Sequence, residues 1–370
     1  MTSEDDRRFM ALAIHLGARG LGRVWPNPAV GCVIVQGTRI VGRGWTQAGG
    51  RPHAEAMALA EAGPAARGAT AYVSLEPCAH HGKTPPCADA LRMAGLARVI
   101  SAQEDPDPRV AGRGHRMLRD AGIRVETGLL AAEAHRLQRG FLSRIQRGRP
   151  MLTLKLAMSV DGRIATETGE SQWITGPEAR RFVHLMRARH DAVLVGAGTA
   201  RADDPQLTVR GLGPLAQPVR IVVARRLDLP GDGALAQSAR EVPLWLLHGP
   251  DAPPAAREVW TARGAHLWEV PLEAGGLDMA AAFAQLGQAG LTRVFCEGGG
   301  QLAATLLKAG LVDDLALFTA GLALGAGARP GIGPLALPHL ADASRLRLVE
   351  SRRVGADLYS LWSDLSAFSV

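Results

Sequence analysis

Residues 53–55 read His-Ala-Glu, and residues 77–87 read Pro-Cys-Ala-His-His-Gly-Lys-Thr-Pro-Pro-Cys. The imidazole of His53 and the thiols of Cys78 and Cys87 form a donor set that zinc prefers. Catalytic zinc sites take three protein ligands and leave the fourth position to water or substrate. Both segments stand where helices are predicted to begin, and a helix N-terminus offers free amides and a positive end that suit thiolates. The two segments therefore predict a catalytic zinc site built on two helix starts.

Glu55 lies two residues after His53 and is not required as a ligand. Hydrolytic loss of an amine from a heterocycle needs an activated water and a group that protonates the departing nitrogen. Zinc lowers the pKa of water, and a carboxylate outside the ligand set transfers the proton. We therefore expect one zinc ion per chain and assign Glu55 as the catalytic acid–base. Chance proximity would explain His-Ala-Glu alone, but not the cysteine segment as well. Eight residues separate the two cysteines, against two in the generic deaminase pattern, which predicts an inserted loop.

Alternating strand and helix patterns predict an α/β fold, with a three-layer first domain. Its predicted strands are residues 30–35, 40–45, 69–75, 97–102 and 123–127, and its predicted helices are residues 53–62, 87–94, 113–121 and 131–145. A polar break at residues 147–150, Arg-Gly-Arg-Pro, divides the chain into domains 1–146 and 147–370. In the second domain we expect strands at 152–157, 192–195, 219–223, 244–247, 293–296 and 315–319, helices at 177–189 and 301–309, and a loop at 321–338.

The composition is that of an ordinary globular protein, with 47% hydrophobic and 21% charged residues among 370. The formal charge of +7 could indicate nucleic acid, but only 4% of residues are aromatic, and an Arg-rich composition or phosphorylated ligands explain it equally. The acidic start is unlike a signal peptide, and no apolar run approaches ~20 residues, so we expect a cytoplasmic protein without a membrane partner. Cys32 and Cys296 lie in apolar runs and are expected in the core.

Residues 76–87, together with Pro-Asn-Pro-Ala-Val-Gly at 26–31 and His-Ala-Glu at 53–55, closely resemble the deaminase domain of the bifunctional riboflavin-biosynthesis deaminase–reductase. The resemblance implies a cytidine-deaminase-like fold and substrate binding by Asn27, His80 and Lys83. An amide reads a pyrimidine edge and Lys pairs with phosphate, so the chemistry agrees. The alternatives are a turn residue for Asn27 and a solvated charge for Lys83.

One segment departs from the family pattern. The family usually has Asp-Pro-Asn-Pro where residues 105–108 read Asp-Pro-Asp-Pro. Asp107 thus replaces an Asn, and a carboxylate near a phosphate is unfavourable, so its role stays open.

Residues 155–163 and 169–176 resemble the reductase half of the same family, which is similar in fold to dihydrofolate reductase. The resemblance implies NADPH as cofactor, in contact with Ala157, Trp173, Thr199, Asp203, Gly299, Gly300, Gln301, Leu302, Ala303, Ala304 and Thr305. It implies that the phosphoribosyl substrate contacts Ser171, Arg187, Leu207, Arg210 and Glu297. Guanidinium groups bind phosphate through two parallel hydrogen bonds, which suits the two arginines. A core position for Trp173 and a turn cap for Asp203 are the alternatives.

Glycines mark the expected cofactor site. Residues 195–201 lack the third glycine of a dinucleotide fingerprint, whereas Glu-Gly-Gly-Gly-Gln at 297–301 follows a strand and opens a helix, where amides bind a pyrophosphate. A flexible turn is the alternative for that run. The family commonly has Asp-Ser after the strand at 219–223, where this chain has Ala-Arg-Arg at 224–226, and Arg225 or Arg226 is expected to meet the adenosine phosphate of NADPH.

The resemblance thus implies a two-step enzyme of riboflavin biosynthesis. Its first step is deamination of 2,5-diamino-6-ribosylamino-4(3H)-pyrimidinone 5′-phosphate, and its second is NADPH-dependent reduction of the ribosyl chain of 5-amino-6-(5-phosphoribosylamino)uracil to ribityl. Lys155, Asp203 and Glu297 are the candidate proton donors of the second step. The expected partners are the small phosphoribosyl pyrimidine and further copies of the chain, as a homodimer or homotetramer, without nucleic acid. The alternatives are a zinc nucleoside or RNA-base deaminase fused to a reductase-like domain, and a nucleic-acid-binding module with a structural zinc.

Overall fold

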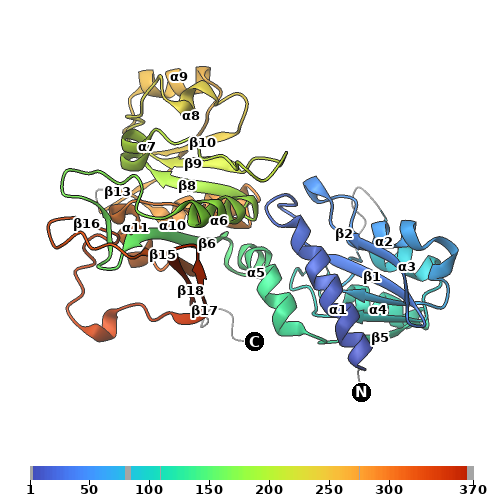
Figure 1. The fold of residues 1–370 in the computed structure, drawn as a ribbon. Helices are drawn as coiled ribbons and strands as arrows, with labels where there is room; N and C mark the ends of the chain where they lie inside the picture. Colours follow the sequence, from blue (N-terminus) through green and yellow to red (C-terminus); the bar gives the residue numbers. More distant parts are fainter. Residues whose placement is uncertain (1–2, 80–84, 109, 275, 365–370) are drawn as a thin grey trace. The chain divides into compact units, whose positions relative to one another are not determined.

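The computed structural model describes residues 3–79, 85–108, 110–274 and 276–364 (Figure 1). The chain forms two compact units, Met1–Gly148 and Arg149–Val370. Helix α5 (Ala131–Arg147) ends the first unit, and Gly148 caps it at φ 69°, a left-handed conformation that favours glycine. The division therefore falls after Gly148, because the helix continues beyond its predicted end at residue 145.

The described part of the first unit contains a five-stranded sheet in the order β2-β1-β3-β4-β5. The strands are β1 (Gly31–Gln36), β2 (Arg39–Trp45), β3 (Thr70–Val73), β4 (Arg98–Ser101) and β5 (Arg124–Thr127). Strand β1 is antiparallel to β2 and β3, whereas β3, β4 and β5 are parallel. The carboxyl ends of β3 and β4 therefore meet at one edge of the sheet, where both continue into loops.

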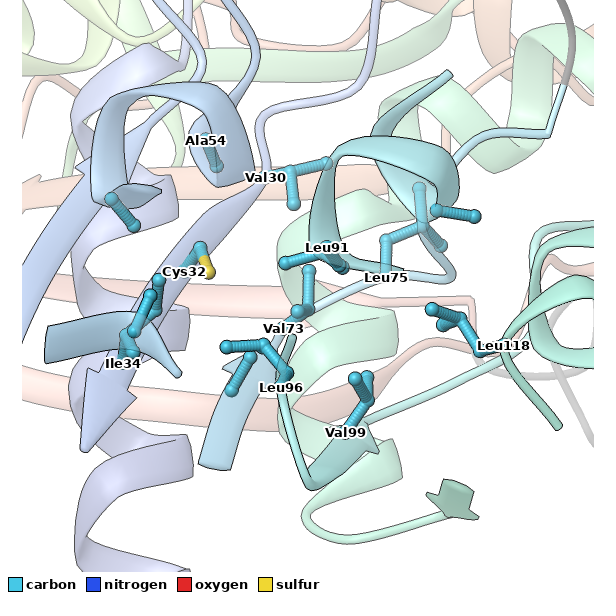
Figure 2. Packing of buried hydrophobic residues seen from close by; sticks show 14 of the residues in the cluster. Val30, Cys32, Ile34, Ala54, Val73, Leu75, Leu91, Leu96, Val99 and Leu118 are labelled. Atoms are coloured by element: carbon cyan, nitrogen blue, oxygen red, sulfur yellow. The ribbon is translucent and has the colours of Figure 1, made fainter. Parts of the chain in front are cut away.

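Helices cover both faces of this sheet, which confirms the three-layer prediction. They are α1 (Glu4–Gly17), α2 (Ala54–Ala62), α3 (Cys87–Met93), α4 (Arg113–Asp120) and α5. Because side chains alternate along a strand, Cys32 and Ile34 of β1 pack with α2 and α3 (Figure 2), while Val33 and Val35 pack with α1. Cys32 is fully buried in this cluster, as expected of a core residue.

Two glycines of β2 determine how closely helix α2 approaches the sheet. A Cβ atom at Gly44 would lie 2.1 Å from the Ala54 carbonyl oxygen, and one at Gly42 would lie 2.1 Å from that of Ala58. The helix backbone therefore rests directly on β2, which fixes the position of His53 at the helix start.

The second unit has, in its described residues, a nine-stranded sheet in the order β11-β10-β9-β8-β14-β6-β15-β18-β17. These strands are β6 (Met151–Ser159), β8 (Ala192–Gly196), β9 (Val219–Val223), β10 (Leu244–His248), β11 (His266–Glu269), β14 (Arg293–Cys296), β15 (Asp314–Ala320), β17 (Arg347–Val354) and β18 (Asp357–Ser363). Two short pairs join β7 (Arg163–Ala165) to β16 (Arg329–Pro330) and β12 (Leu272–Glu273) to β13 (Gly276–Leu277). The helices are α6 (Pro177–Ala188), α7 (Ala197–Asp203), α8 (Ala234–Gln237), α9 (Pro254–Ala262), α10 (Met279–Gln288) and α11 (Gly300–Lys308).

The order of the parallel strands reverses beside β14. From β8 the chain adds β9, β10 and β11 outward, then returns to insert β14 between β8 and β6. Ligands of open α/β sheets bind beyond the carboxyl ends of strands at such a reversal. The loops after β6, β8 and β14 are therefore the place to look for a site in this unit. Among the described residues, no helix combines the length and the apolar character required to cross a membrane.

Candidate functional site

The three predicted zinc ligands come together in the first unit. His53 is the N-cap of α2, Cys87 is the first residue of α3, and Cys78 lies in the loop after β3. His53 Nδ1 is 3.2 Å from Cys87 Sγ and 3.7 Å from Cys78 Sγ, and all three donor atoms lie within 4.8 Å of one another. One nitrogen and two sulfurs at this spacing fit zinc, with one position of a tetrahedron left for another ligand.

The two thiols differ in their readiness to ionise. The hydrogen bond with Cys87, together with His53, lowers the pKa of Cys78 to about 4 despite its burial. The backbone N–H of Cys87 also donates to Cys78 Sγ at 3.3 Å. The hydrogen bond with the Cys78 thiolate and burial raise the pKa of Cys87 well above its ordinary value. These opposite shifts favour a thiolate at Cys78 and a thiol at Cys87 in the metal-free protein.

Glu55 lies in the first turn of α2 with only 3% of its surface exposed. Burial and the neighbouring Cys78 raise the pKa of this carboxyl group to about 7, although the side-chain hydrogen bond with Cys87 and the charge of His53 oppose the shift. A buried carboxyl group beside the sulfur ligands, with a pKa near neutrality, is suited to accept and return a proton.

The structure describes only part of the predicted deaminase substrate site. Asn27 packs against Gly50, three residues before His53, where a Cβ atom would lie 1.9 Å from Asn27 Nδ2. Gly50 also has φ 84°, so both the close approach of Asn27 and the left-handed backbone conformation require glycine there. His80 and Lys83 lie outside the described residues.

Glu76, which the sequence did not single out, links the metal-site loop to the loop after β4. Its carboxylate accepts four backbone N–H groups, from Asp105, Gly112, Gly114 and His115, at 2.9–3.2 Å. It also approaches Glu104 and His115 closely enough to form a second group of potential metal ligands. Four amide donors already occupy the Glu76 oxygens, so the grouping of Glu76 with Glu104 and His115 holds the two loops together rather than binding a metal ion.

Asp107 belongs to the same loop and is 5% exposed. Its backbone N–H donates to Asp105 Oδ1, and its carbonyl oxygen accepts from Val110 and Ala111 at 2.7 and 3.0 Å. The residue that departs from the family pattern thus forms a tight turn.

A cluster of buried charges lies at the strand reversal of the second unit. Arg187 of α6 forms two hydrogen bonds with the Glu297 carboxylate and donates to the Thr208 carbonyl oxygen at 2.7 Å. Both charged side chains are 11% exposed. Burial lowers the pKa of Lys155 on β6, and Glu297, Arg187 and Asp203 are the charges that act on it. Although burial raises the pKa of Glu297, Arg187 outweighs it and the net direction is downward.

The glycine-rich run opens helix α11 beside this cluster. Gly299 is the N-cap at φ 95°, and Thr199 Oγ1 of α7 donates to the Gly298 carbonyl oxygen at 3.2 Å. A Cβ atom at Gly300 would lie 2.6 Å from the Pro330 carbonyl oxygen, so the backbone is tightly enclosed. The first amides of a helix have no intrahelical acceptor and can bind a phosphate.

Not every residue of the expected cofactor set offers a polar group at this helix start. The N–H of Ala303 donates to Gly299, and Thr305 Oγ1 donates to Gln301 inside the helix. The side chains of Ala303 and Ala304 are buried. Gly300 to Leu302, the first residues of the helix, are therefore the part of the run whose amides have no acceptor within the helix.

The remaining predicted residues of the second unit differ in their exposure and contacts. Arg210 is exposed; its guanidinium donates to Gln206 Oε1 at 2.6 Å and its backbone N–H donates to His184 Nδ1 at 3.2 Å. Leu207 is buried with φ 55°. Trp173 is 68% exposed with the Arg180 guanidinium 4.5 Å from its ring centre, so the core alternative is wrong. Ala157 lies on β6, Ser171 lies in the loop before α6, and Asp203 ends α7.

Comparisons with known proteins cover both units. The model of the RibD C-terminal domain matches residues 150–360, and that of the cytidine and deoxycytidylate deaminase zinc-binding region matches residues 3–103. Riboflavin biosynthesis protein RibD of Escherichia coli K12 is 44% identical over 95% of this chain and 98% of its own, and that of Haemophilus influenzae is 40% identical over 96% of both.

Solved structures agree with these matches over nearly the full chain. RibD of Acinetobacter baumannii, form 1, superposes with a TM-score of 0.88 at 37% identity, covering 97% of this chain and 99% of its own. A diaminohydroxyphosphoribosylaminopyrimidine deaminase/5-amino-6-(5-phosphoribosylamino)uracil reductase of Thermotoga maritima superposes with a TM-score of 0.85 at 32% identity, covering 97% and 98%. The predicted order of a deaminase domain followed by an α/β reductase domain is thereby confirmed.

Proposed function

Because this chain belongs to the RibD family, in which a zinc-dependent deaminase is joined to an NADPH-dependent reductase of riboflavin biosynthesis, we propose a role for each group of side chains at its two sites. The protein deaminates the diaminopyrimidine ribosyl phosphate and reduces the resulting phosphoribosylaminouracil. Its substrate is a small pyrimidine, and the match to both domains over nearly the whole chain leaves no support for the RNA-base alternative.

For the first step, His53, Cys78 and Cys87 bind the zinc ion, which supplies an activated water when bound. Glu55 would transfer the two protons of the attacking water in turn, one to the neighbouring ring nitrogen and one to the departing amine nitrogen, so that the ring C–NH2 and water would become a ring carbonyl and ammonia. The geometric support is the position of the buried Glu55 beside Cys87 with its pKa near neutrality. Asn27, His80 and Lys83 bind the substrate, the amide at the pyrimidine edge and Lys83 at the phosphate.

For the second step, the amides at the start of α11 and Thr199 bind NADPH, which supplies a hydride when bound. Ala157, Trp173 and Asp203 also contact the cofactor, and the cofactor crevice is the proposed site beyond the carboxyl ends of β6, β8 and β14. Arg187, Arg210, Ser171, Leu207 and Glu297 hold the phosphoribosyl group. The single observation that carries this assignment is that Arg187, Glu297 and Lys155 gather at the strand reversal beside the α11 helix start.

The experiment joins metal analysis to both activities. The purified chain should hold about one zinc ion, release ammonia from the phosphoribosyl diaminopyrimidine, and then oxidise NADPH. Cys87→Ser should lose zinc and ammonia release but still oxidise NADPH when given the deaminated intermediate. Cys32→Ala, which changes a buried cysteine of the same domain outside the ligand set, is the matched control. Full zinc content in Cys87→Ser would refute the ligand assignment.

We also propose that the enzyme is a homodimer or homotetramer in the cytoplasm. Strand β17 ends the nine-stranded sheet in the described residues, and its first seven residues are exposed on both faces. Long exposed edges of this kind are paired or protected in stable proteins. Light scattering of the purified enzyme and fractionation of cells would test the two proposals.

A further inference from the structure

Two arginines stand at the carboxyl end of β9, next to the crevice. Sheet pairing extends beyond the strand, because the N–H of Ala224 donates to Leu247 and the N–H of Gly249 donates to Arg225, both at 2.9 Å. Strands β9, β8 and β14 are parallel, so Arg225 and Arg226 lie on the same side of the sheet, at the carboxyl ends of the strands, as the first residues of α7 and α11.

The spacing of the strands places these arginines at a useful distance from the α11 helix start. Strands β14, β8 and β9 are consecutive in the sheet. Neighbouring strands are ~4.8 Å apart, so the end of β9 lies ~10 Å across the sheet from the glycine run. A dinucleotide with its pyrophosphate at α11 and its adenosine directed along the strand ends would bring a 2′-phosphate to β9.

The two arginines are held differently. Arg225 Nε donates to Asp251 Oδ2 at 3.0 Å, and its Nη2 is also 3.0 Å from that oxygen. A Cβ atom at Gly249 would lie 2.5 Å from Asp251 Oδ1 and 3.3 Å from Arg225 Cγ, so glycine makes room for the ion pair. Arg226 approaches Asp251 only at 3.9 Å, with 62% of its side chain exposed.

The charges around Arg226 leave the site positive. Asp251 is shared by two guanidinium groups, and the other carboxylate nearby in sequence, Asp228, pairs with Arg201 at 2.6 Å. The group of Arg225, Arg226 and Asp251 thus carries one net positive charge, and a guanidinium matches a phosphate with two parallel hydrogen bonds.

We propose that Arg226 binds the 2′-phosphate of NADPH and that Arg225 is a positioning residue, which neutralises Asp251 and keeps that carboxylate from repelling the phosphate. The inference rests on the proposed cofactor crevice and adds the residue that distinguishes NADPH from NADH.

Calorimetry with 2′,5′-ADP and 5′-AMP tests the proposal without turnover. The unchanged enzyme should bind 2′,5′-ADP more tightly than 5′-AMP. Arg226→Ala should weaken the binding of 2′,5′-ADP roughly 10- to 100-fold, as expected for loss of a charge-assisted hydrogen bond. The affinity for 5′-AMP should change by no more than about twofold. The ratio of kcat/KM for NADPH over NADH should fall by a similar factor.

The matched control is Arg189→Ala. Arg189 is exposed and follows α6, close to the amino-terminal end of β8, at the opposite edge of the sheet. The Arg189→Ala substitution removes the same charge and should change the affinity for neither 2′,5′-ADP nor 5′-AMP. Thermal melting of both variants checks that the fold is retained.

The role of Arg225 has its own test. Arg225→Ala should weaken the binding of 2′,5′-ADP, because Asp251 would keep only its longer contact with Arg226 and its charge would oppose the phosphate. Asp251→Asn in that background should restore most of the lost affinity. A double variant as weak as Arg225→Ala would overturn the positioning role. Unchanged 2′,5′-ADP affinity in Arg226→Ala would overturn the assignment of Arg226 alone, whereas an unchanged enzyme that binds neither nucleotide would refute the cofactor crevice as well.

Discussion

The Glu76 carboxylate accepts the backbone N–H of Gly114 at 2.9 Å, and Gly114 lies so close to the metal-site loop that no side chain fits there. A Cβ atom at Gly114 would be 1.9 Å from the Pro77 carbonyl oxygen. Pro77 directly precedes Cys78, so the start of α4 and the zinc-ligand loop are packed backbone against backbone. The position of one metal ligand therefore depends on a contact between loops from neighbouring strands.

Gly114→Ala should destabilise the first domain by about 1–3 kcal/mol, because overpacking against a rigid backbone forces the loop to move. Since that movement shifts Cys78, zinc affinity should fall as well. Chemical denaturation and zinc titration of the variant measure the two effects.

Gly122→Ala is the control for this prediction. Gly122 has φ 78° with nothing near its missing side chain, so the change costs only the strain of a left-handed residue, of order 1 kcal/mol. Equal zinc affinity in both variants would contradict the link between Gly114 and the metal loop.

The sequence predicts well those parts of the site that depend on local structure. His53 and Cys87 stand at helix starts as expected, because a polar or Pro-rich segment followed by an Ala-rich run determines where a helix begins. The glycine run before α11 follows the same local logic.

Contacts between distant segments could not be predicted in this way. The Arg187–Glu297 pair joins residues 110 positions apart, and the Glu76 contacts span up to 39 positions. No spacing rule relates such residues, because the sheet order that brings them together is set by packing. Helix α1 has no counterpart among the predicted elements, although its start carries a local signal, the reciprocal capping box of Ser3 and Asp6.

Asp6 makes that missed helix sensitive to acid. Although burial raises the pKa of Asp6, hydrogen bonds from Tyr72 and Arg98 outweigh it and lower the pKa to about 2. Because folding lowers this pKa, the ionised Asp6 stabilises the fold at pH values above its ordinary pKa near 3.8, and this stabilisation disappears as the pH falls toward 2. Asp6→Asn should therefore lose about 2 kcal/mol of unfolding free energy at pH 7.

Denaturation of both proteins across pH measures this loss, and the difference between them should shrink from pH 4 downward. Asp5→Asn is the control, because the Asp5 side chain is 56% exposed and 3.9 Å from its partner Arg8. A difference that stays constant down to pH 2 would show that the ionised form of Asp6 is not what stabilises the helix.

Zinc uptake should release protons. Cys87 has its pKa raised well above the ordinary value, so it is a thiol at pH 7 in the metal-free protein, and zinc binds the thiolate. Affinity should therefore fall as pH is lowered. Calorimetric titration with zinc in two buffers of different ionisation enthalpy gives the number of protons released, and a value of zero would contradict the thiol–thiolate pair.

Glu55→Gln should separate metal binding from chemistry. The amide has nearly the same shape but cannot carry the proton, so ammonia release should fall by about 10²–10⁴-fold while zinc stays near one ion per chain. Ammonia assays and metal analysis of the same preparation check both. Loss of zinc from this variant would mean that Glu55 is required for the metal site itself.

Arg210→Ala should weaken substrate binding by the reductase alone. Its guanidinium lies on an exposed loop, where it contacts Gln206, and it is proposed to bind the substrate phosphate. Loss of a charge-assisted hydrogen bond should raise KM for the phosphoribosylaminouracil roughly 10- to 100-fold. The phosphate is bound equally in the ground and transition states, so kcat should change little.

The control is Arg240→Ala, which replaces an exposed arginine that caps the end of α9 and should leave KM unchanged. If Arg210→Ala lowers deaminase and reductase activity equally, the two steps share a binding site and the division of roles between the domains is wrong.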